Sequence, residues 1–256
     1  MDYNVEKIFP NHFMLSYKNK GASKALVGEV GFYFFLISDL ESKWDTRSIK
    51  KFENSIVKAI LLLEKQAKNY GIDLDIKYAK EVISIGEKIQ RENWRTALYK
   101  AIGKYSFKTV DEFQEYYEKK YKLNDSCVIL VFNKDHRSYA SVASSKRPKT
   151  TECSIIGKEK GFITSAFSHT TIMHEILHQF GAQDYYYPAS VQKNAQLYIK
   201  NSIMLWSDHE TIDTLTAYLI GWTTHIDKTT ERFLKSIYTI TQDAIDDATN
   251  DEWKNN

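Results

Sequence analysis

The 256-residue chain has few cysteines and little net charge. Its two cysteines, Cys127 and Cys153, are too few for a disulfide framework, so we predict that both are ordinary buried thiols. Lys and Arg number 35 against 33 Asp and Glu, and a formal charge of +2 creates no strong field for nucleic acid. We therefore expect no nucleic-acid partner, and we interpret the basic stretch at residues 146–149 as a solvated loop.

Long apolar runs are also missing. The most apolar segment, residues 25–37, carries Glu29 and is shorter than the ~20 residues that a membrane-spanning helix needs. The first twenty residues lack the basic head and apolar stretch of a secretory signal. The sequence as written therefore predicts a cytoplasmic protein without membrane attachment, although a secreted protein without its leader would look the same. Frequent Lys, Ile, Asn and Tyr indicate an AT-rich bacterial genome.

The composition is that of a folded protein. Apolar residues make up 43% of the chain and aromatic residues 14%, enough for the core of one large domain or two small ones. Period-2 and period-3.6 patterns predict an α/β domain whose sheet is mostly parallel. We predict strands at residues 27–38, 72–85, 127–132, 153–156 and 162–167, and helices at 46–70, 93–105, 110–121, 211–222 and 229–248. A further helix is predicted to start at Ser168 or Thr170.

The most informative stretch lies on that further helix and reads His174-Glu-Ile-Leu-His178-Gln-Phe-Gly181-Ala-Gln-Asp184. Residues four apart on a helix lie on one face, so His174 and His178 can direct their imidazoles at one metal ion. Glu175 lies ~100° around the helix, where it can act as a general base beside the ion. This His-Glu-x-x-His pattern is typical of zinc hydrolases, and it predicts a Zn²⁺ cofactor.

A catalytic zinc site needs a third protein ligand. Gly181 can end the helix with a positive φ, and Asp184 is then the first side chain beyond it that ligates well. In the opposing interpretation, Gly181 only caps the helix and Asp184 starts a turn. Glu210 is an alternative third ligand, as in gluzin-type peptidases, where a glutamate on a later helix completes the site.

The stretch resembles the extended zinc-binding motif of the metzincin clan of metallopeptidases, and is similar to the snapalysin-like branch, in which Asp is the third ligand. Ser202-Ile203-Met204 resembles the clan's methionine turn, which implies that Met204 is an apolar floor beneath the histidines; ordinary core packing is the alternative. Trp206 departs from the tyrosine that some subfamilies place two residues after the methionine. The specific match covers only residues 174–204.

The resemblance implies a metzincin-like zincin fold, with a twisted sheet, long helices, the active-site helix and a smaller, mostly helical C-terminal subdomain. Residues 1–181 would form the upper subdomain and residues 182–256 the C-terminal one, within one catalytic domain. The region 153–167 would be the sheet edge that pairs with extended substrate.

The resulting hypothesis is a monomeric zinc metalloendopeptidase that acts on a peptide or protein substrate. Tyr185, Tyr186 and Tyr187 follow the third ligand; Tyr185 and Tyr187 are candidates for lining the substrate pocket or stabilising an oxyanion, with packing as the alternative. A catalytically silent binding domain, or a structural zinc site closed by a fourth ligand such as His209, is the competing hypothesis.

Overall fold

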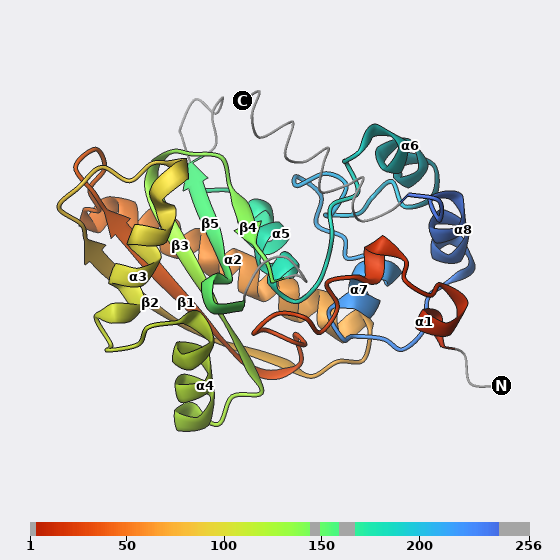
Figure 1. The fold of residues 1–256 in the computed structure, drawn as a ribbon, viewed down its shortest axis with the longest axis horizontal. Helices are drawn as coiled ribbons and strands as arrows, with labels where there is room; N and C mark the ends of the chain where they lie inside the picture. The colour runs from red at the N-terminus through yellow and green to blue at the C-terminus, as the bar shows by residue number, and fades with distance from the viewer. Residues whose placement is uncertain (1–3, 144–148, 159–166, 241–256) are drawn as a thin grey trace.

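A five-stranded sheet organises the computed structural model, which describes residues 4–143, 149–158 and 167–240 (Figure 1). The strand order is β2-β1-β3-β5-β4. The strands are β1 (Gly28–Ser38), β2 (Leu74–Ser84), β3 (Asp125–Asp135), β4 (Tyr139–Ser141) and β5 (Cys153–Lys158). All neighbouring pairs are parallel except β4 with β5. The predicted α/β class with a mostly parallel sheet is therefore confirmed.

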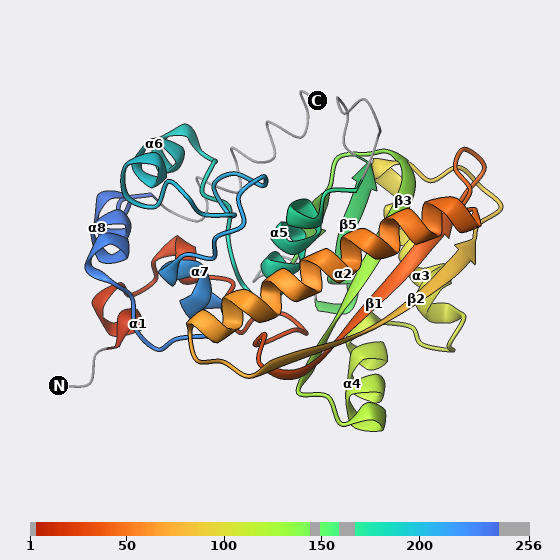
Figure 2. The same ribbon diagram turned by 180° about the vertical axis from the view of Figure 1, so that it is seen from behind.

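Helices cover both faces of this sheet, as the turned view shows (Figure 2). On one face lie α2 (Thr46–Asn69) and α5 (His169–Gln179); on the other lie α3 (Trp94–Gly103) and α4 (Val110–Tyr121). Asp45 caps α2 by accepting the Ser48 N–H, and Gly71 follows its last turn with φ +69°. Both ends of this helix confirm the sequence prediction, since capping chemistry is local.

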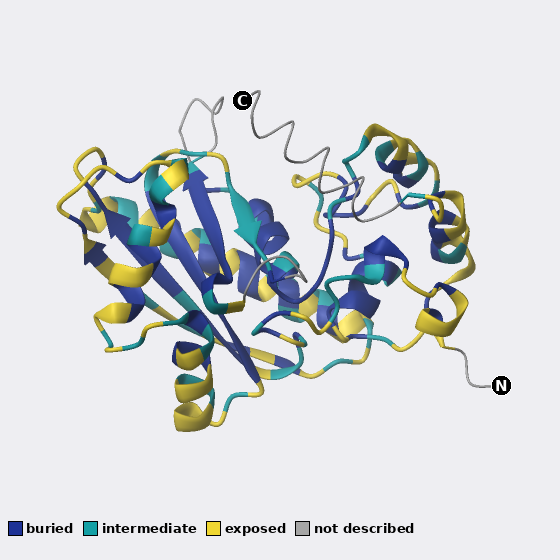
Figure 3. Cartoon of the chain, viewed as in Figure 1, coloured by how far each residue is buried: buried dark blue, intermediate teal, exposed yellow. Residues whose placement is uncertain are grey.

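The sheet separates two apolar cores, and its central strands are buried along most of their length (Figure 3). Side chains of β1 and β3 alternate between the two cores, which explains why both strands are almost continuously apolar. Cys127 belongs to one core and Cys153 to the other. Both are fully buried free thiols, as predicted.

A smaller helical half adjoins the sheet. It holds α6 (Ala189–Tyr198), α7 (Thr214–Leu219) and α8 (Lys228–Ser236), together with the N-terminal α1 (Val5–Ile8) and the 3₁₀ turn η1 (Phe13–Leu15) (Figure 1). The His12 ring is 3.0 Å from the Leu234 carbonyl, and the Gln183 side chain donates to the Phe13 carbonyl. The chain's beginning therefore packs with its C-terminal helices.

Several elements differ from the sequence prediction. Strand β4, the helix α6 and the short turns η2 (Arg91–Asn93) and η3 (Lys149–Thr151) were not expected, because short or polar segments carry little periodicity. Helix α7 is shorter than predicted because Asp213 caps it by accepting the Leu215 and Thr216 N–H groups. Helix α8 ends at Ser236, so the helix predicted at 229–248 is wrong for residues 237–240. The strand predicted at 162–167 (except Phe167), the remainder of that helix and most of the 146–149 loop lie outside the described residues.

The sheet edge near the motif helix also differs from the expectation. Strand β5 is not an edge strand, because β4 pairs with it antiparallel through Tyr139–Ile155 and Ser141–Cys153. Within the described part of the chain, strand β4 therefore forms this edge of the sheet; residues 159–166 of the expected edge region lie outside that part. Among the described residues, no helix has the length and apolar character to cross a membrane.

Candidate metal centre

Helix α5 is anchored to the sheet by buried side chains. The Ser154 hydroxyl on β5 donates to the Glu175 carbonyl at 2.7 Å, and the Gln179 amide donates to the same hydroxyl at 2.7 Å. Ser168 caps the helix by accepting the Thr171 N–H, as one of the two predicted caps. Since almost every residue of α5 is buried, its histidines have little freedom to move.

The chain leaves α5 through Gly181, whose φ is +101°. The Gly181 N–H donates to the His178 carbonyl at 3.0 Å, and the Ala182 N–H donates to the Leu177 carbonyl at 3.1 Å. A Cβ at Gly181 would lie 3.0 Å from the Cα of Lys18, so a close backbone approach adds to the conformational requirement. This turn returns Asp184 to the face that carries the histidines.

The three predicted ligands come together. His174 Nε2 lies 3.0 Å and His178 Nε2 3.2 Å from Asp184 Oδ1, and the two Nε2 atoms are 3.2 Å apart. Ligand atoms at ~2.0–2.1 Å from a tetrahedral zinc are about 3.3 Å from one another. Among the described residues, this is the group of His, Cys, Asp and Glu side chains that could hold a metal ion.

The two imidazoles are oriented by backbone carbonyls. His174 Nδ1 is 2.8 Å from the Ile203 carbonyl, and His178 Nδ1 is 2.8 Å from the Ala182 carbonyl. A carbonyl can only accept, so each Nδ1 carries a hydrogen, and a ring without a second proton directs its Nε2 lone pair toward Asp184. These two carbonyl contacts fix the tautomer that binds a metal.

The converging acceptor atoms of His174, His178 and Asp184 favour a bound positive charge. Asp184 Oδ1 is buried and receives no well-aligned hydrogen bond from the described residues. Burial opposes its charge, but the adjacent imidazoles of His178 and His174 hold the pKa of this carboxyl well below its usual range. Burial likewise opposes a charge on His178, yet Asp184 raises the pKa of its ring. Three converging acceptors are therefore stable only with a proton or a metal ion among them.

Glu175 lies beside these ligands. Its side chain is buried, and its Oε2 atom has no hydrogen-bond partner among the described residues. The pKa of this carboxyl is raised to about 8, mainly by burial; His174 opposes this rise and the charge of Asp184 contributes to it. A buried carboxyl with a free oxygen next to a metal position is suited to exchange protons.

A cleft of about 710 Å³ runs past the cluster. His174, Glu175 and Thr171 of α5 form part of its wall. The remaining walls come from the β3–β4 connection, the end of β5 and the helical half: Asp135, His136, Arg137, Ser138, Lys158, Tyr186, Gln192, Leu205, Trp206 and Ser207. The cluster is thus open to a ligand from a space between the sheet and the helical half.

The tyrosines after Asp184 take different places. Tyr185 does not line the cleft: it is fully buried, its hydroxyl bonds with Thr216 at 2.9 Å, and its ring packs against Phe233. Tyr187 is also not among the cleft residues and precedes a cis peptide bond to Pro188. Tyr186, with its ring centroid 6.2 Å from that of His174, is the one of the three in the cleft wall.

The predicted methionine turn adjoins the site. Met204 is fully buried, and its N–H donates to the Ser202 hydroxyl at 3.0 Å. The preceding carbonyl, of Ile203, is the one that orients His174. The functional part of this turn thus includes a backbone oxygen, which has no signature in the sequence.

The alternative third ligand is elsewhere. Glu210 Oε1 lies 3.1 Å from the His169 ring in an exposed pair, and among the described residues neither Glu210 nor His209 belongs to the group that could hold a metal ion. The structure therefore favours Asp184 over Glu210.

Comparison with models of known protein families gives no match, and comparison with curated protein sequences gives none either. The function must be argued from these residues and their geometry.

Proposed function

We propose that the protein is a zinc-dependent metalloendopeptidase of a metzincin-like type, with Asp184 as the third ligand. The observation that supports this most strongly is the convergence of His174 Nε2, His178 Nε2 and Asp184 Oδ1 within 3.0–3.2 Å, with both rings held by carbonyls. No other His, Cys, Asp or Glu of the described residues joins this group, so a metal bound by these three residues alone would keep a coordination position for water or substrate. This favours a catalytic site over a structural one.

The chain's own residues would divide the work of peptide hydrolysis. A zinc ion bound here would supply Lewis-acid activation of water and polarisation of the scissile carbonyl. Glu175, with its free Oε2 in the cleft wall, would take the proton of the attacking water and deliver it to the leaving amine. The buried helix and the two carbonyl contacts would keep the ligands in place during this exchange.

An extended peptide is the substrate that the sheet edge fits best. Strand β4 is the sheet edge beside α5, and the β3–β4 connection lines the metal cleft. Pairing with β4 would hold the peptide by main-chain hydrogen bonds, which select for extended shape more than for sequence. We therefore propose an unfolded or loop segment of a protein as substrate.

The test compares two glutamate variants. Glu175→Ala should keep one zinc per chain and lose hydrolysis of fluorescently labelled casein by at least about a hundredfold, in line with the loss of a general base. Glu210→Ala, the matched control, should keep both zinc and activity. Asp184→Ala should lose zinc, measured by atomic absorption after dialysis. Full activity of Glu175→Ala would refute the mechanism, and full zinc content of Asp184→Ala would refute the ligand set.

A further inference from the structure

Strand β2 forms the opposite edge of the sheet from β4 and has an unpaired side. It pairs with β1 in unbroken register from Leu74 to Ser84. The Gly28 N–H donates to the Asp73 carbonyl and the Ile85 N–H donates to the Ser38 carbonyl, so odd-numbered residues direct their backbone groups to β1. Even-numbered residues consequently direct theirs outward, since backbone direction alternates along a strand.

The outward-directed backbone groups of β2 have few hydrogen-bond partners among the described residues. The Ile76 N–H donates to Glu64 Oε1 at 3.1 Å, but no described residue accepts from the outward N–H groups of Tyr78, Lys80 and Val82. The strand contains no proline and no bulge, and Val82 is exposed. A regular eleven-residue edge of this kind is a template for another strand.

The sequence of β2 is complementary to itself. If two copies pair antiparallel about a two-fold axis at Ala79, Lys77 faces Glu81 of the second copy and Glu81 faces its Lys77. In the same register Ile76 faces Val82, and all the outward-directed backbone groups meet as hydrogen-bonded pairs. Ala79, exposed and small, lies at the axis, where the chains approach most closely.

The side chains of Lys77 and Glu81 are available for this exchange. Lys77 is bound to Asp75 at 2.6 Å with both side chains at least half exposed, and Glu81 contacts the exposed Lys104. Exposed pairs of this kind contribute little, so replacing them costs little.

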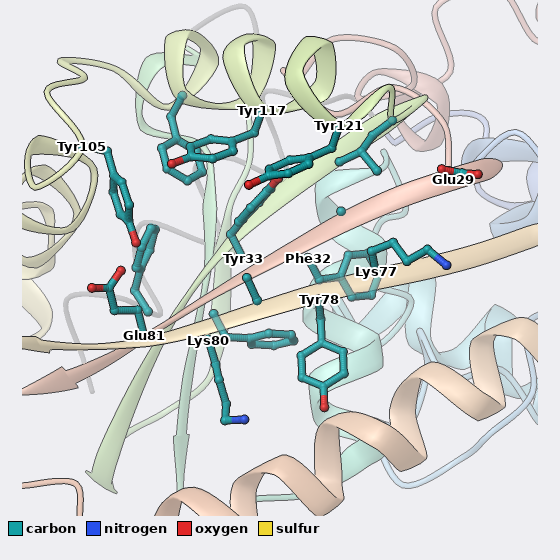
Figure 4. A pocket seen from close by; sticks show the side chains of 16 residues that line it. Glu29, Phe32, Tyr33, Lys77, Tyr78, Lys80, Glu81, Tyr105, Tyr117 and Tyr121 are labelled. Atoms are coloured by element: carbon teal, nitrogen blue, oxygen red, sulfur yellow. The ribbon is translucent and has the colours of Figure 1, made fainter.

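An aromatic groove of about 560 Å³ lies along the same edge (Figure 4). Gly31 and Tyr33 of β1 form its floor with Ala79 of β2, and Tyr117 and Tyr121 of α4 form a wall. Lys77 and Glu81 flank this floor, whereas the side chain of Lys80 is on the other face, on the side of α2. A strand added to β2 would cover the groove's open side, so apolar burial would add to the main-chain hydrogen bonds.

We propose that the protein forms a symmetric dimer in which two copies of β2 pair antiparallel about Ala79, joining the two sheets into one. The occupant is a second copy of this chain because Lys77 and Glu81 match each other across the axis. The dimer differs from the monomer expected from the sequence. The dimer leaves the candidate metal clefts of both copies open at the outer edges of the joined sheet. The dimer proposal therefore does not depend on the proposed peptidase function.

The test reverses the charges at Lys77 and Glu81 and measures the monomer–dimer equilibrium by sedimentation velocity. Protein concentrations run from about 1 to about 200 µM, roughly the range in which protein dimers of moderate affinity dissociate. Lys77→Glu and Glu81→Lys each place like charges opposite each other twice across the axis, so each should weaken dimerisation about tenfold or more. The double variant exchanges the charges and should restore the dimer. Lys235→Glu removes a paired surface lysine on α8 and should leave it unchanged.

The thermal unfolding midpoint of each variant shows whether it is folded. A wild-type protein that stays monomeric at 200 µM would overturn the proposal. So would a dimer that neither single reversal weakens, which would use another surface, or a double variant that fails to recover, which would exclude this register. Because casein hydrolysis is read separately, loss of the dimer and loss of peptidase activity are distinguishable.

Discussion

The turn at Gly181 gives a sharp test of how the third ligand is positioned. Gly181→Ala must place a Cβ at φ +101°, 3.0 Å from the Lys18 Cα and 3.2 Å from the Tyr17 carbonyl. Positive φ costs a residue with a Cβ about 1–2 kcal/mol, and a backbone approach this close adds about 1–2 kcal/mol because neither neighbour can rotate away. We expect a total loss of about 2–4 kcal/mol of unfolding free energy.

Two other glycines separate these contributions. Gly71 has φ +69° with nothing within 4 Å of an added Cβ, so Gly71→Ala should cost only the conformational part, about 1 kcal/mol. Gly103 lies at the end of α3 with open space and no positive φ, so Gly103→Ala should stabilise by about 0.5–1 kcal/mol. Urea denaturation measures the unfolding free energy of all three variants, provided that its dependence on urea concentration has the same slope in each.

The same series should separate stability from metal binding. Only Gly181→Ala displaces the segment that carries Asp184, so only this variant should weaken zinc binding, by about tenfold or more in a competition with a chromogenic chelator. If Gly181→Ala costs no more than Gly71→Ala, the close approach to Lys18 is not rigid. If it retains wild-type zinc affinity, the turn does not set the position of Asp184, and the reasoning is refuted.

Two further predictions concern buried carboxyls away from the metal. Asp39 is fully buried; burial opposes its charge, but Lys134 and the N–H groups of Ile89, Ser42 and Glu41 lower its pKa to about 2. The ionised Asp39 carboxylate should therefore stabilise the fold above its ordinary pKa, and this stabilisation should be lost as the pH falls toward 2. Asp39→Ala should lower the unfolding free energy by about 2–4 kcal/mol in urea denaturation, because it leaves Lys134 without its buried partner. Burial raises the pKa of Glu152 to about 8, so stability should fall as the pH rises from about 4.5 through 8, and Glu152→Gln should flatten this slope in thermal unfolding. An unchanged slope in that variant would assign the pH dependence to another group.

Local signals in the sequence were enough to predict the long elements and the ligands. Asp45 and Gly71 mark both ends of α2 because capping depends on residues close in the chain. The spacing of His174 and His178 defines one helix face, and Gly181 indicates where the chain turns back to Asp184. These inferences need no tertiary information, and the structure brings the three residues together as expected.

The parts that could not be predicted depend on contacts between distant segments. Strand β4 is only three residues long, and it becomes a strand because β5 offers an edge. Tyr185, Tyr186 and Tyr187 are equivalent by type, and only the path of the chain decides that Tyr186 reaches the cleft while Tyr185 joins the core. The carbonyl of Ile203 orients His174 although any residue could supply it.

That carbonyl shows how the site connects the two halves of the molecule. His174 and His178 lie on a helix fixed to the sheet. Asp184 belongs to the segment that leads into the helical half, and the Ile203 carbonyl lies within that half, between α6 and α7. Without a cation, the three acceptors in this interface repel one another unless they share a proton, which the raised pKa of His178 favours. A metal ion bound here would remove that repulsion and hold both halves through its ligands. Ligand binding and docking of the helical half are therefore thermodynamically coupled, and each stabilises the other by the same free energy.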